Sequence, residues 1–274
     1  MECDKLKIFV CIKQVPGVAE VKIDAKTGKL VREGVLSIIN PVDKNAIELA
    51  LQIKDRKHAE VIALSMGPPQ AEEALYEALA MGVDNAFLLT DKEFAGADTL
   101  ATSYTLALAI KQILKDSGIT EPYLIVCGSQ AIDGDTAQVG PELAEELNLP
   151  QVTNVQKFEM IDERIIVESI LRPEEIVVLE TKLPALITVL KVINTPRFPT
   201  LIGIVEAYKE KKVTHLNASK LKAEKVKIGL TGSQTQVWKI FVPQQKGEHI
   251  KLSGSINEMV KELCLNLKED KILI

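Results

Sequence analysis

The sequence predicts an α/β fold with a doubly wound, mostly parallel sheet and a C-terminal arm. Segments with the periodicity of strands and helices alternate four times over roughly the first 145 residues, as in a parallel sheet with crossover helices. The segments 59–65 and 123–127 are apolar without alternation, which is typical of strands covered on both faces. After residue 205 the chain is lysine-rich and aperiodic, so we expect a domain at 1–205 and an arm at 206–274.

The elements of the first half follow from apolar spacing and from turn residues. A β-rich run ends at Pro16, Thr27-Gly28 is the turn of a small hairpin, and a helix of about 13 residues opens at Pro41. The other elements expected in this half are the strands 6–15, 20–24, 29–32, 59–65, 86–90 and 123–127 and the helices 70–80, 97–115 and 138–147.

The second half predicts further strands and one terminal helix. An amphipathic helix fits 255–268. Because the chain between 228 and 250 has little periodicity, we expect this arm and its helix to pack on a partner subunit. The β-like segments, which can extend the same sheet, are 152–159, 164–170, 175–181 and 185–193.

Composition excludes several classes of function. The chain of 274 residues has 33 basic and 38 acidic side chains, hence a net charge of −5, whereas nucleic-acid binders are basic. Aromatic residues make up 4%, which disfavours a base-stacking surface. No apolar run approaches the roughly 18 residues of a membrane helix. The N-terminus lacks a signal-peptide plan, so we expect a cytoplasmic protein without membrane insertion and without nucleic acid as a partner.

Cysteine spacing and the absence of catalytic motifs restrict the chemistry. Cys3, Cys11, Cys127 and Cys264 form no CxxC pair, so we expect no zinc, iron–sulfur or other metal site. Cys11 and Cys127 lie in apolar runs and are predicted to be buried thiols in a reducing compartment. The sequence has no GxSxG or HExxH motif and no obvious pair of catalytic carboxylates, so no catalytic residue is assigned.

The strongest local signal is the loop 127–140, between a predicted strand and a predicted helix. Its glycines permit tight turns, Thr136 and Gln138 can donate hydrogen bonds, and the helix start favours a phosphate. The loop matches neither GxGxxG nor the P-loop pattern. Asp133 and Asp135 would repel a phosphate, so we expect them to cap backbone N–H groups or to meet a ribose. A capped turn without any ligand is the alternative.

Two further loops are expected at the same edge of the sheet. In the first, Asn40 can bond to a base edge and Asp43 suits a helix start. In the second, Met66 ends a strand and can pack on an adenine. Lys13 can reach a cofactor from the first strand, or simply snorkel at the strand end. Each feature alone is more often a cap or a turn, but three loops at one sheet edge predict a ligand cleft.

Several motifs together resemble the beta subunit of electron transfer flavoprotein. They cover residues 6–210, and the forms GDTAQVG and KQVP are most similar to the branch of anaerobic bacteria that performs electron bifurcation. The motifs are KIFVCIKQVP (7–16), SIINPVDKNAIELAL (37–51), VIALSMGPPQAEEAL (61–75), ALAMGVD (78–84), FAGADT (94–99), CGSQAIDGDTAQVGPELAEELNLPQVT (127–153) and NTPRFPTLIGI (194–204).

The resemblance implies a Rossmann-like, adenine-nucleotide-binding domain and a heterodimer with an alpha subunit that holds one FAD. In the bifurcating branch the beta subunit holds a second FAD, which takes electrons from NADH. One electron goes to ferredoxin or flavodoxin, and the other goes through the alpha-subunit FAD to a flavin dehydrogenase of the acyl-CoA or 2-hydroxy acid type. Two alternatives stay open: a non-bifurcating beta subunit with structural AMP, and a nucleotide-sensing binding module.

The resemblance also carries site positions over to this chain. The partner-docking loop falls on 194–201, which includes Arg197, and an exposed Leu201 anchors the dehydrogenase. The alternative is that Leu201 is the first core residue of the helix that follows. The expected cofactor contacts, together with Lys13, are Cys11, Asn40, Pro41, Val42, Asp43, Met66, Gly128, Ser129, Gln130, Ala131, Ile132, Asp133, Gly134, Asp135, Thr136, Ala137, Gln138 and Val139.

The chain departs from the family pattern at three places. Ser129 stands where a Lys or Arg is usual, so a cation near the nucleotide is missing. Thr195 stands where a Glu usually precedes the proline of the docking loop. Ser169-Ile170 replaces a polar pair that in the family can contact the mobile flavin domain. These departures bear on which dehydrogenase is served and on the gating of electron transfer.

Overall fold

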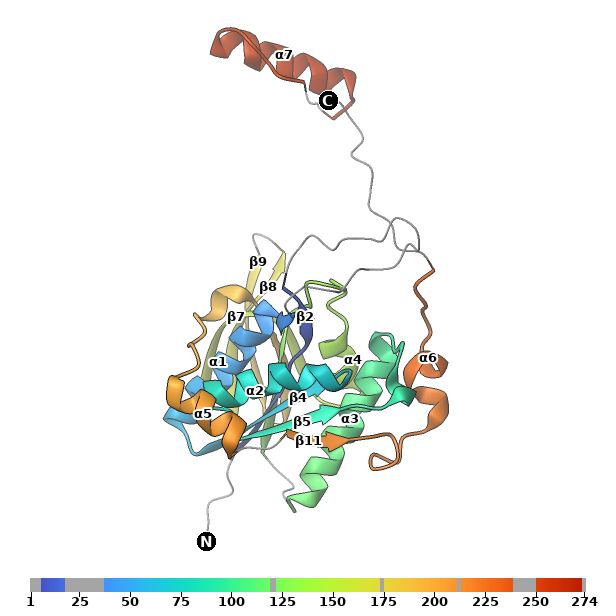
Figure 1. Cartoon of the computed structure of the whole chain (residues 1–274). Coiled ribbons are helices and arrows are strands. Elements are labelled where there is room, and N and C mark those ends of the chain that lie inside the picture. The colour runs from blue at the N-terminus through green and yellow to red at the C-terminus, as the bar shows by residue number, and fades with distance from the viewer. Residues whose placement is uncertain are drawn as a thin grey trace. The chain divides into compact units, whose positions relative to one another are not determined.

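The computed structural model describes residues 6–17, 37–118, 122–172, 175–210, 213–238 and 250–272 (Figure 1). The chain forms two units, residues 1–238 and residues 239–274. The second unit contains the helix α7 (Ile256–Glu269), which confirms the predicted terminal helix. The hairpin expected at 20–24 and 29–32 lies outside the described residues.

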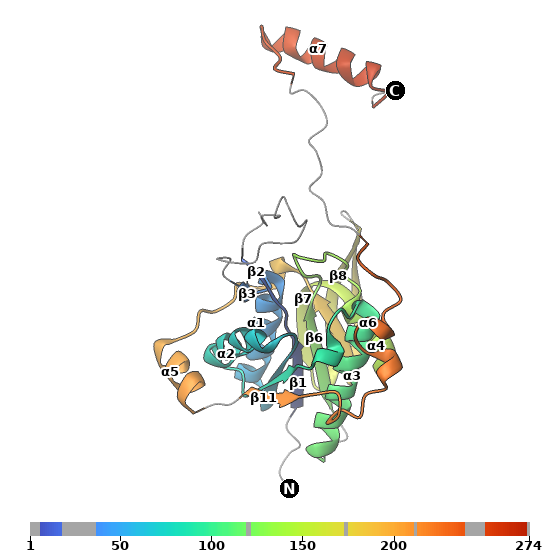
Figure 2. The same cartoon turned by 45° about the vertical axis from the view of Figure 1, so that its right-hand side comes forward.

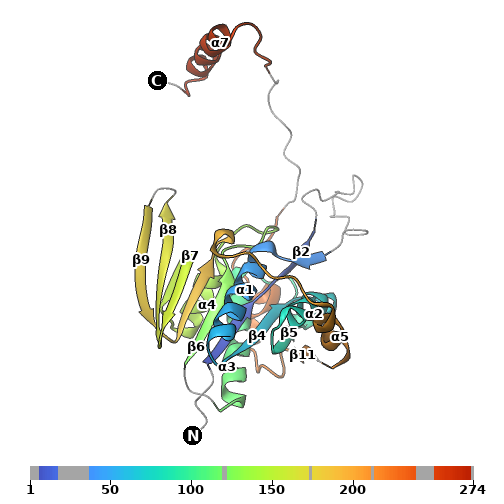
Figure 3. The same cartoon turned by 90° about the vertical axis from the view of Figure 1, so that its left-hand side faces the viewer.

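A sheet of nine strands runs through the first unit, and its order is β11-β5-β4-β1-β6-β10-β7-β8-β9. The strands from β11 to β7 are parallel to their neighbours, whereas β8 and β9 continue the sheet as antiparallel strands at one side (Figure 3). This confirms the predicted mostly parallel sheet. The strand bounds are β1 Leu6–Cys11, β4 Ala59–Met66, β5 Asn85–Leu89, β6 Tyr123–Gly128, β7 Gln151–Ile161, β8 Arg164–Arg172, β9 Glu175–Lys182, β10 Ala185–Val189 and β11 Val213–Leu216.

Helices cover both faces of the sheet, as the term doubly wound implies (Figure 2). The first face carries α1 (Pro41–Arg56), α2 (Glu72–Met81) and α5 (Leu201–Lys209). The second face carries α3 (Thr99–Asp116), α4 (Val139–Leu147) and the short α6 (Gly229–Gly232). Single 3₁₀ turns are η1 Pro69–Ala71, η2 Lys92–Phe94, η3 Lys191–Ile193 and η4 Lys225–Lys227.

Each face of the sheet packs its own core. Successive side chains of a strand point to opposite faces, so Ile8 and Val10 of β1 join the core under α1 and α2. Phe9 and Cys11 of the same strand join the core under α3 and α4. All six residues of β1 are buried, which explains why the sequence shows an apolar run without alternation.

The predicted strand 6–15 is divided in the structure. The backbone N–H of Lys13 donates to the side chain of Asp43 and not to a neighbouring strand, so the main-sheet ladder ends. The chain then forms β2 (Gln14–Pro16), which pairs antiparallel with β3 (Ser37–Ile39). The sequence did not predict β3, because three residues are too few to show a period.

The compact unit continues past the boundary expected at residue 205. β11 pairs in parallel with β5, and Leu216 is buried in the core. The unit then extends to Trp238. The sequence gives little sign of this strand, because lysines surround it and only Val213 and Leu216 of its four residues are apolar. Within the described ranges, no helix is long and apolar enough to cross a membrane.

Candidate functional site

The loops that follow β1, β4 and β6 meet at one edge of the sheet. These three strands are neighbours in the order β4-β1-β6, and the carboxyl ends of parallel strands share an edge. α1 begins at the same edge, since the backbone N–H of Asn40 donates to the carbonyl of Lys13 at 2.8 Å. The predicted convergence of the loops is therefore present in the structure.

Asn40 joins two of these loops through its side chain. Its amide nitrogen Nδ2 donates to Gln130 O at 2.9 Å and to Asp43 Oδ1 at 3.0 Å, and its Oδ1 accepts from Ile132 N at 3.2 Å. The residue is fully buried. Both N–H groups of this amide therefore donate to protein atoms in the structure, and the contact of Asn40 with a base edge stays a prediction. Asn40 positions the β6–α4 loop.

Asp43 and Gly128 form the closest contact between α1 and β6. A Cβ on Gly128 would lie 2.2 Å from Asp43 Oδ1 and 3.0 Å from Asp43 N, so only glycine fits. Asp43 Oδ2 accepts from Lys13 N at 2.8 Å. Burial raises the pKa of Asp43 from 3.8 to about 7, although hydrogen bonds from Asn40, Lys13 and Gly128 act against this rise. Pro41 and Val42, before Asp43, are half-buried.

Both carboxylates of the β6–α4 loop have side-chain partners. Asp133 forms an ion pair with Lys13 Nζ at 2.8 Å, and Asp135 accepts from Gln130 Nε2. The partners found for these carboxylates are side chains, and their contact with a ribose stays a prediction. Lys13 therefore bridges two loops, and the negative charge of Asp133 is offset at the site.

The backbone of the β6–α4 loop contains both left-handed and right-handed residues. Asp135 and Ala137 adopt left-handed conformations with φ of 53° and 54°, and Gln138, which follows Ala137, is right-handed. Alternation of this kind turns successive N–H groups toward one point. α4 then begins at Val139 without a side-chain cap on its first turn. Loop residues exposed to solvent are Gln130, Ile132, Asp133, Gly134, Asp135, Thr136, Ala137 and Gln138, whereas Gly128, Ser129 and Ala131 are half-buried.

Three sulfur side chains lie at the ends of the three strands. Cys11 and Cys127 are paired in register, both are buried, and half-buried Met66 packs against the same core. The pKa of Cys127 is raised by its contact with the Cys11 thiol and by burial. The predicted burial of both thiols is confirmed. Ser65 is buried and its hydroxyl has no partner among the described residues. It precedes Met66 and therefore points to the opposite face.

The loop between η3 and α5 contains both predicted docking residues, but they play different roles. Leu201, the first residue of α5, is 79% exposed, so the alternative that it belongs to the core is wrong. Arg197 instead turns toward α1, where its guanidinium donates to Glu48 and Asp55. Arg197 therefore holds the loop on the protein. The sequence did not identify Glu48, Asn45 or the 90% exposed Phe198 as part of this region.

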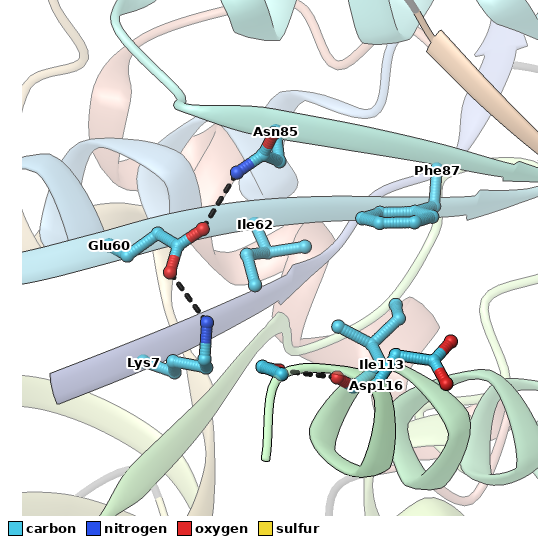
Figure 4. Close-up of a pocket in the computed structure, with 8 residues that line it drawn as sticks. Lys7, Glu60, Ile62, Asn85, Phe87, Ile113 and Asp116 are labelled. Carbon is cyan, nitrogen blue, oxygen red and sulfur yellow. Dashed lines mark hydrogen bonds and ion pairs between the residues drawn. The ribbon is translucent and has the colours of Figure 1, made fainter. Parts of the chain in front are cut away.

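A separate hollow of about 250 Å³ lies at the amino ends of β1, β4 and β5 (Figure 4). Lys7 is buried there and pairs with Glu60, which also accepts from Asn85. Ile62, Phe87 and Ile113 line the hollow between this pair and Asp116. Because parallel strands begin at this edge, the hollow and the converging loops are at opposite ends of the sheet. Within the described ranges, no cluster of three or more His, Cys, Asp or Glu side chains is arranged to hold a metal ion.

Asp43→Asn is expected to change how stability depends on pH. The folded protein keeps a proton on Asp43 up to about pH 7, whereas the unfolded chain releases it near pH 3.8. The wild type therefore loses free energy of unfolding relative to the variant as the pH rises between these values, and the difference is constant above them. Thermal melts of both proteins from pH 4 to 8 measure this. A wild type that gains relative stability with pH would show that the three donors outweigh burial.

Comparison with known proteins identifies the family. The model of the electron transfer flavoprotein domain matches residues 27–228. The electron transfer flavoprotein subunit beta of Thermoanaerobacterium thermosaccharolyticum is 46% identical, over 98% of this chain and the whole relative. That of Megasphaera elsdenii is 48% identical over 88% of this chain and 89% of the relative. Subunit CarD of the caffeyl-CoA reductase-Etf complex of Acetobacterium woodii is 46% identical over 98% of this chain and all of CarD.

The family model's match includes α1, β4, β6 and the docking loop, whereas β1 lies before it. The matches agree with the α/β fold and with the resemblance found in the sequence motifs. The chain therefore belongs to the electron transfer flavoprotein family, among its beta subunits.

Proposed function

We propose that this chain binds FAD at the edge where the loops converge and takes electrons from NADH. One electron goes to ferredoxin or flavodoxin, and the other goes through an alpha-subunit FAD to a flavin dehydrogenase. The observation that carries the proposal is the β6–α4 loop, whose left-handed residues and uncapped helix start suit a diphosphate. FAD, when bound, supplies the electron-transfer chemistry. The complex is proposed to work in the cytoplasm.

The residues of this chain bind and orient the nucleotide. The backbone N–H groups of Gly134 and of residues 136–139 provide donors for the phosphates, whereas the Asp135 N–H donates to Ala131 O at 2.8 Å. Asn40 and Asp43 hold this loop on α1, so the donors stay in place as the ligand enters. Cys11 and Met66 provide an apolar surface for the adenine. The Lys13–Asp133 pair spans the loops at the rim, where its separation would give a long ligand room.

Two apolar surfaces are proposed to contact the alpha subunit. The first is α7, where Ile256, Val260 and Leu263 are exposed on one side of a helix that has its own capping box. A stable amphipathic helix with no buried residue of its own needs an apolar partner. The second is the outer strand β9, where Ile176 and Val178 are more than half exposed.

The docking loop is proposed to contact the dehydrogenase through Leu201. CarD, a relative over its whole length, is named as part of a complex with caffeyl-CoA reductase. A dehydrogenase or reductase that acts on acyl-CoA substrates is therefore the first candidate partner, and a 2-hydroxy acid dehydrogenase is the second.

Ser129 favours an alternative in which this chain holds AMP. Its side chain brings no positive charge to the loop, and its N–H is used by Val189 O at 2.9 Å. A single phosphate needs less positive charge than a diphosphate. In that case the protein is a non-bifurcating carrier. A nucleotide-sensing module, the third reading of the sequence, gains no support because it needs neither the docking loop nor α7.

Nucleotide content of the heterodimer tests the proposal. The chain is co-purified with its alpha subunit, the complex is denatured, and the released FAD and AMP are quantified. We expect two FAD and no AMP per heterodimer, whereas the isolated alpha subunit should release one FAD as the control. One FAD and one AMP would overturn the bifurcating function and establish the AMP alternative.

A further inference from the structure

We propose that Glu48 of α1 is a positioning residue for electron delivery, because it fixes the docking loop through Arg197. The inference rests on the proposed contact between Leu201 and a dehydrogenase. It adds that residues of α1 set the conformation of the loop. These residues are far from the loop in sequence and are proposed to act without touching the partner.

Arg197 donates three hydrogen bonds to Glu48. The Arg197 backbone N–H and Nε both donate to Glu48 Oε2, at 3.0 and 2.8 Å, and Nη2 donates to Glu48 Oε1 at 3.1 Å. Nη2 also donates to Asp55 Oδ2 at 2.8 Å. This two-pronged contact fixes the plane of the guanidinium as well as its position.

Burial makes this contact hard to replace by water. Glu48 is 4% exposed, whereas the Arg197 side chain is 36% exposed. Burial acts to raise the pKa of Glu48, but the hydrogen bonds from Arg197 and Gln52 outweigh it and hold that pKa below its usual value. Glu48 is therefore an anion at neutral pH, and Arg197 is its main counter-charge.

A second contact fixes the loop one turn earlier on α1. Asn45 is buried, and its Nδ2 donates to Asn194 O at 2.8 Å, while Asn194 Nδ2 donates back to Asn45 O at 3.0 Å. Asn45 Nδ2 also lies 3.2 Å from Lys191 O. The loop is thus attached to α1 at both Asn194 and Arg197.

The far end of the loop is fixed by the packing of α5 on α2. A Cβ on Gly203 would lie 2.4 Å from Ala80 O, which shows how close the helices are. The rings of Tyr76 and Tyr208 are stacked, with centroids 4.6 Å apart. Between these fixed points the loop presents Phe198 and Leu201, which are 90% and 79% exposed. A pre-ordered loop loses less entropy when its apolar side chains dock.

Glu48→Gln is the central test, in the complete heterodimer with its dehydrogenase. The variant keeps the size of the side chain but removes the charge that holds Arg197. We expect the KM of the dehydrogenase for the carrier to rise about tenfold with kcat unchanged. The reason is that the loop of the variant loses its conformational entropy only when it docks. Glu224→Gln, which removes an exposed carboxylate paired with Lys227, should leave KM unchanged.

Trypsin provides a readout that is independent of the dehydrogenase. Arg197 precedes Phe198, so the bond between them is a trypsin site whose arginine is held by Glu48. Cleavage after Arg197 should be faster in Glu48→Gln, while cleavage at other sites and the melting temperature of the heterodimer stay close to the wild type. If either the KM or this cleavage rate is unchanged, Glu48 does not act through Arg197 and the inference is wrong.

Leu201→Ala and Arg197→Gln separate this inference from the docking proposal. If Leu201→Ala raises KM and Glu48→Gln does not, the loop docks without help from α1. If neither variant raises KM, the docking proposal itself fails. If Glu48→Gln does not fold, Arg197→Gln removes the same contact at its more exposed residue and must raise KM to a similar extent. The KM of the double variant should then be no higher than that of Arg197→Gln alone.

Discussion

Gly128→Ala is expected to remove the nucleotide from this chain and to destabilise the fold by about 2–3 kcal/mol, since overpacking at a rigid contact carries a cost of this size. The new Cβ would lie 2.2 Å from Asp43 Oδ1, 3.0 Å from Asp43 N and 3.1 Å from Val42 C. Two of these atoms belong to the backbone of α1, so no side-chain rotation relieves the clash. β6 and α1 must separate.

This separation would act directly on the ligand loop. Asn40 and Asp43 connect α1 with Lys13, Gln130 and Ile132, and each of these bonds is between 2.8 and 3.2 Å. A shift of a few tenths of an ångström breaks several of them together. Nucleotide released from the denatured heterodimer should fall by the equivalent bound to this chain, and the melting temperature should fall as well.

Gly134→Ala is the matched control in the same loop. A Cβ there meets nothing within 4 Å, so the variant should melt like the wild type. If Gly128→Ala retains a full complement of nucleotide, the contact between α1 and β6 is not what shapes the site. If both variants melt at an equally lowered temperature, the loop tolerates no added side chain and Gly128 has no special role.

Leu201→Ala is expected to lower kcat/KM of the dehydrogenase for the carrier by about 30-fold, the effect of losing one apolar anchor of an interface. Leu201 is 79% exposed at the first turn of α5, where Thr200 caps the helix by accepting from Gly203 N at 3.0 Å. Its side chain is not part of the core, so the variant should fold normally. Both nucleotides should stay bound.

Val226→Ala removes an apolar side chain that is 69% exposed elsewhere on the unit and is the control for this prediction. It should leave kcat/KM unchanged. Stopped-flow reduction of the dehydrogenase, followed at the flavin absorbance, gives both rates. Equal rates for Leu201→Ala and the wild type would remove Leu201 from the docking surface.

The sequence predicts the sheet and its loops well because both depend on short-range patterns. The parallel strands are continuous apolar runs, and the loops are marked by Gly, Pro, Asn and Asp at the ends of those runs. The short β3 and the lysine-flanked β11 have no such pattern. β11 is recognised as a strand only in the folded structure, where it pairs with the edge of β5.

The roles of individual polar residues could not be predicted in the same way. Arg197 and Glu48 are 149 positions apart, so no local pattern shows that they are partners. The sequence predicts that Asn40 can bond to a base edge, but it does not show which protein atoms accept from its amide. In the fold these are Gln130 O and Asp43 Oδ1. The competition between a ligand and the protein for one donor is decided by packing.

α1 has a consequence for exchanging partner specificity between related carriers. Asp43, in its first turn, touches the ligand loop, and Glu48, five residues later and about 8 Å along the axis, holds the docking loop. A transplant of residues 191–201 alone would place a foreign segment on α1. The side chains of Asn45, Glu48 and Asp55 on that helix bind the native segment. Recombination between carriers should therefore succeed when α1 and the segment are inherited as one unit, although Glu48 and Arg197 are 149 positions apart.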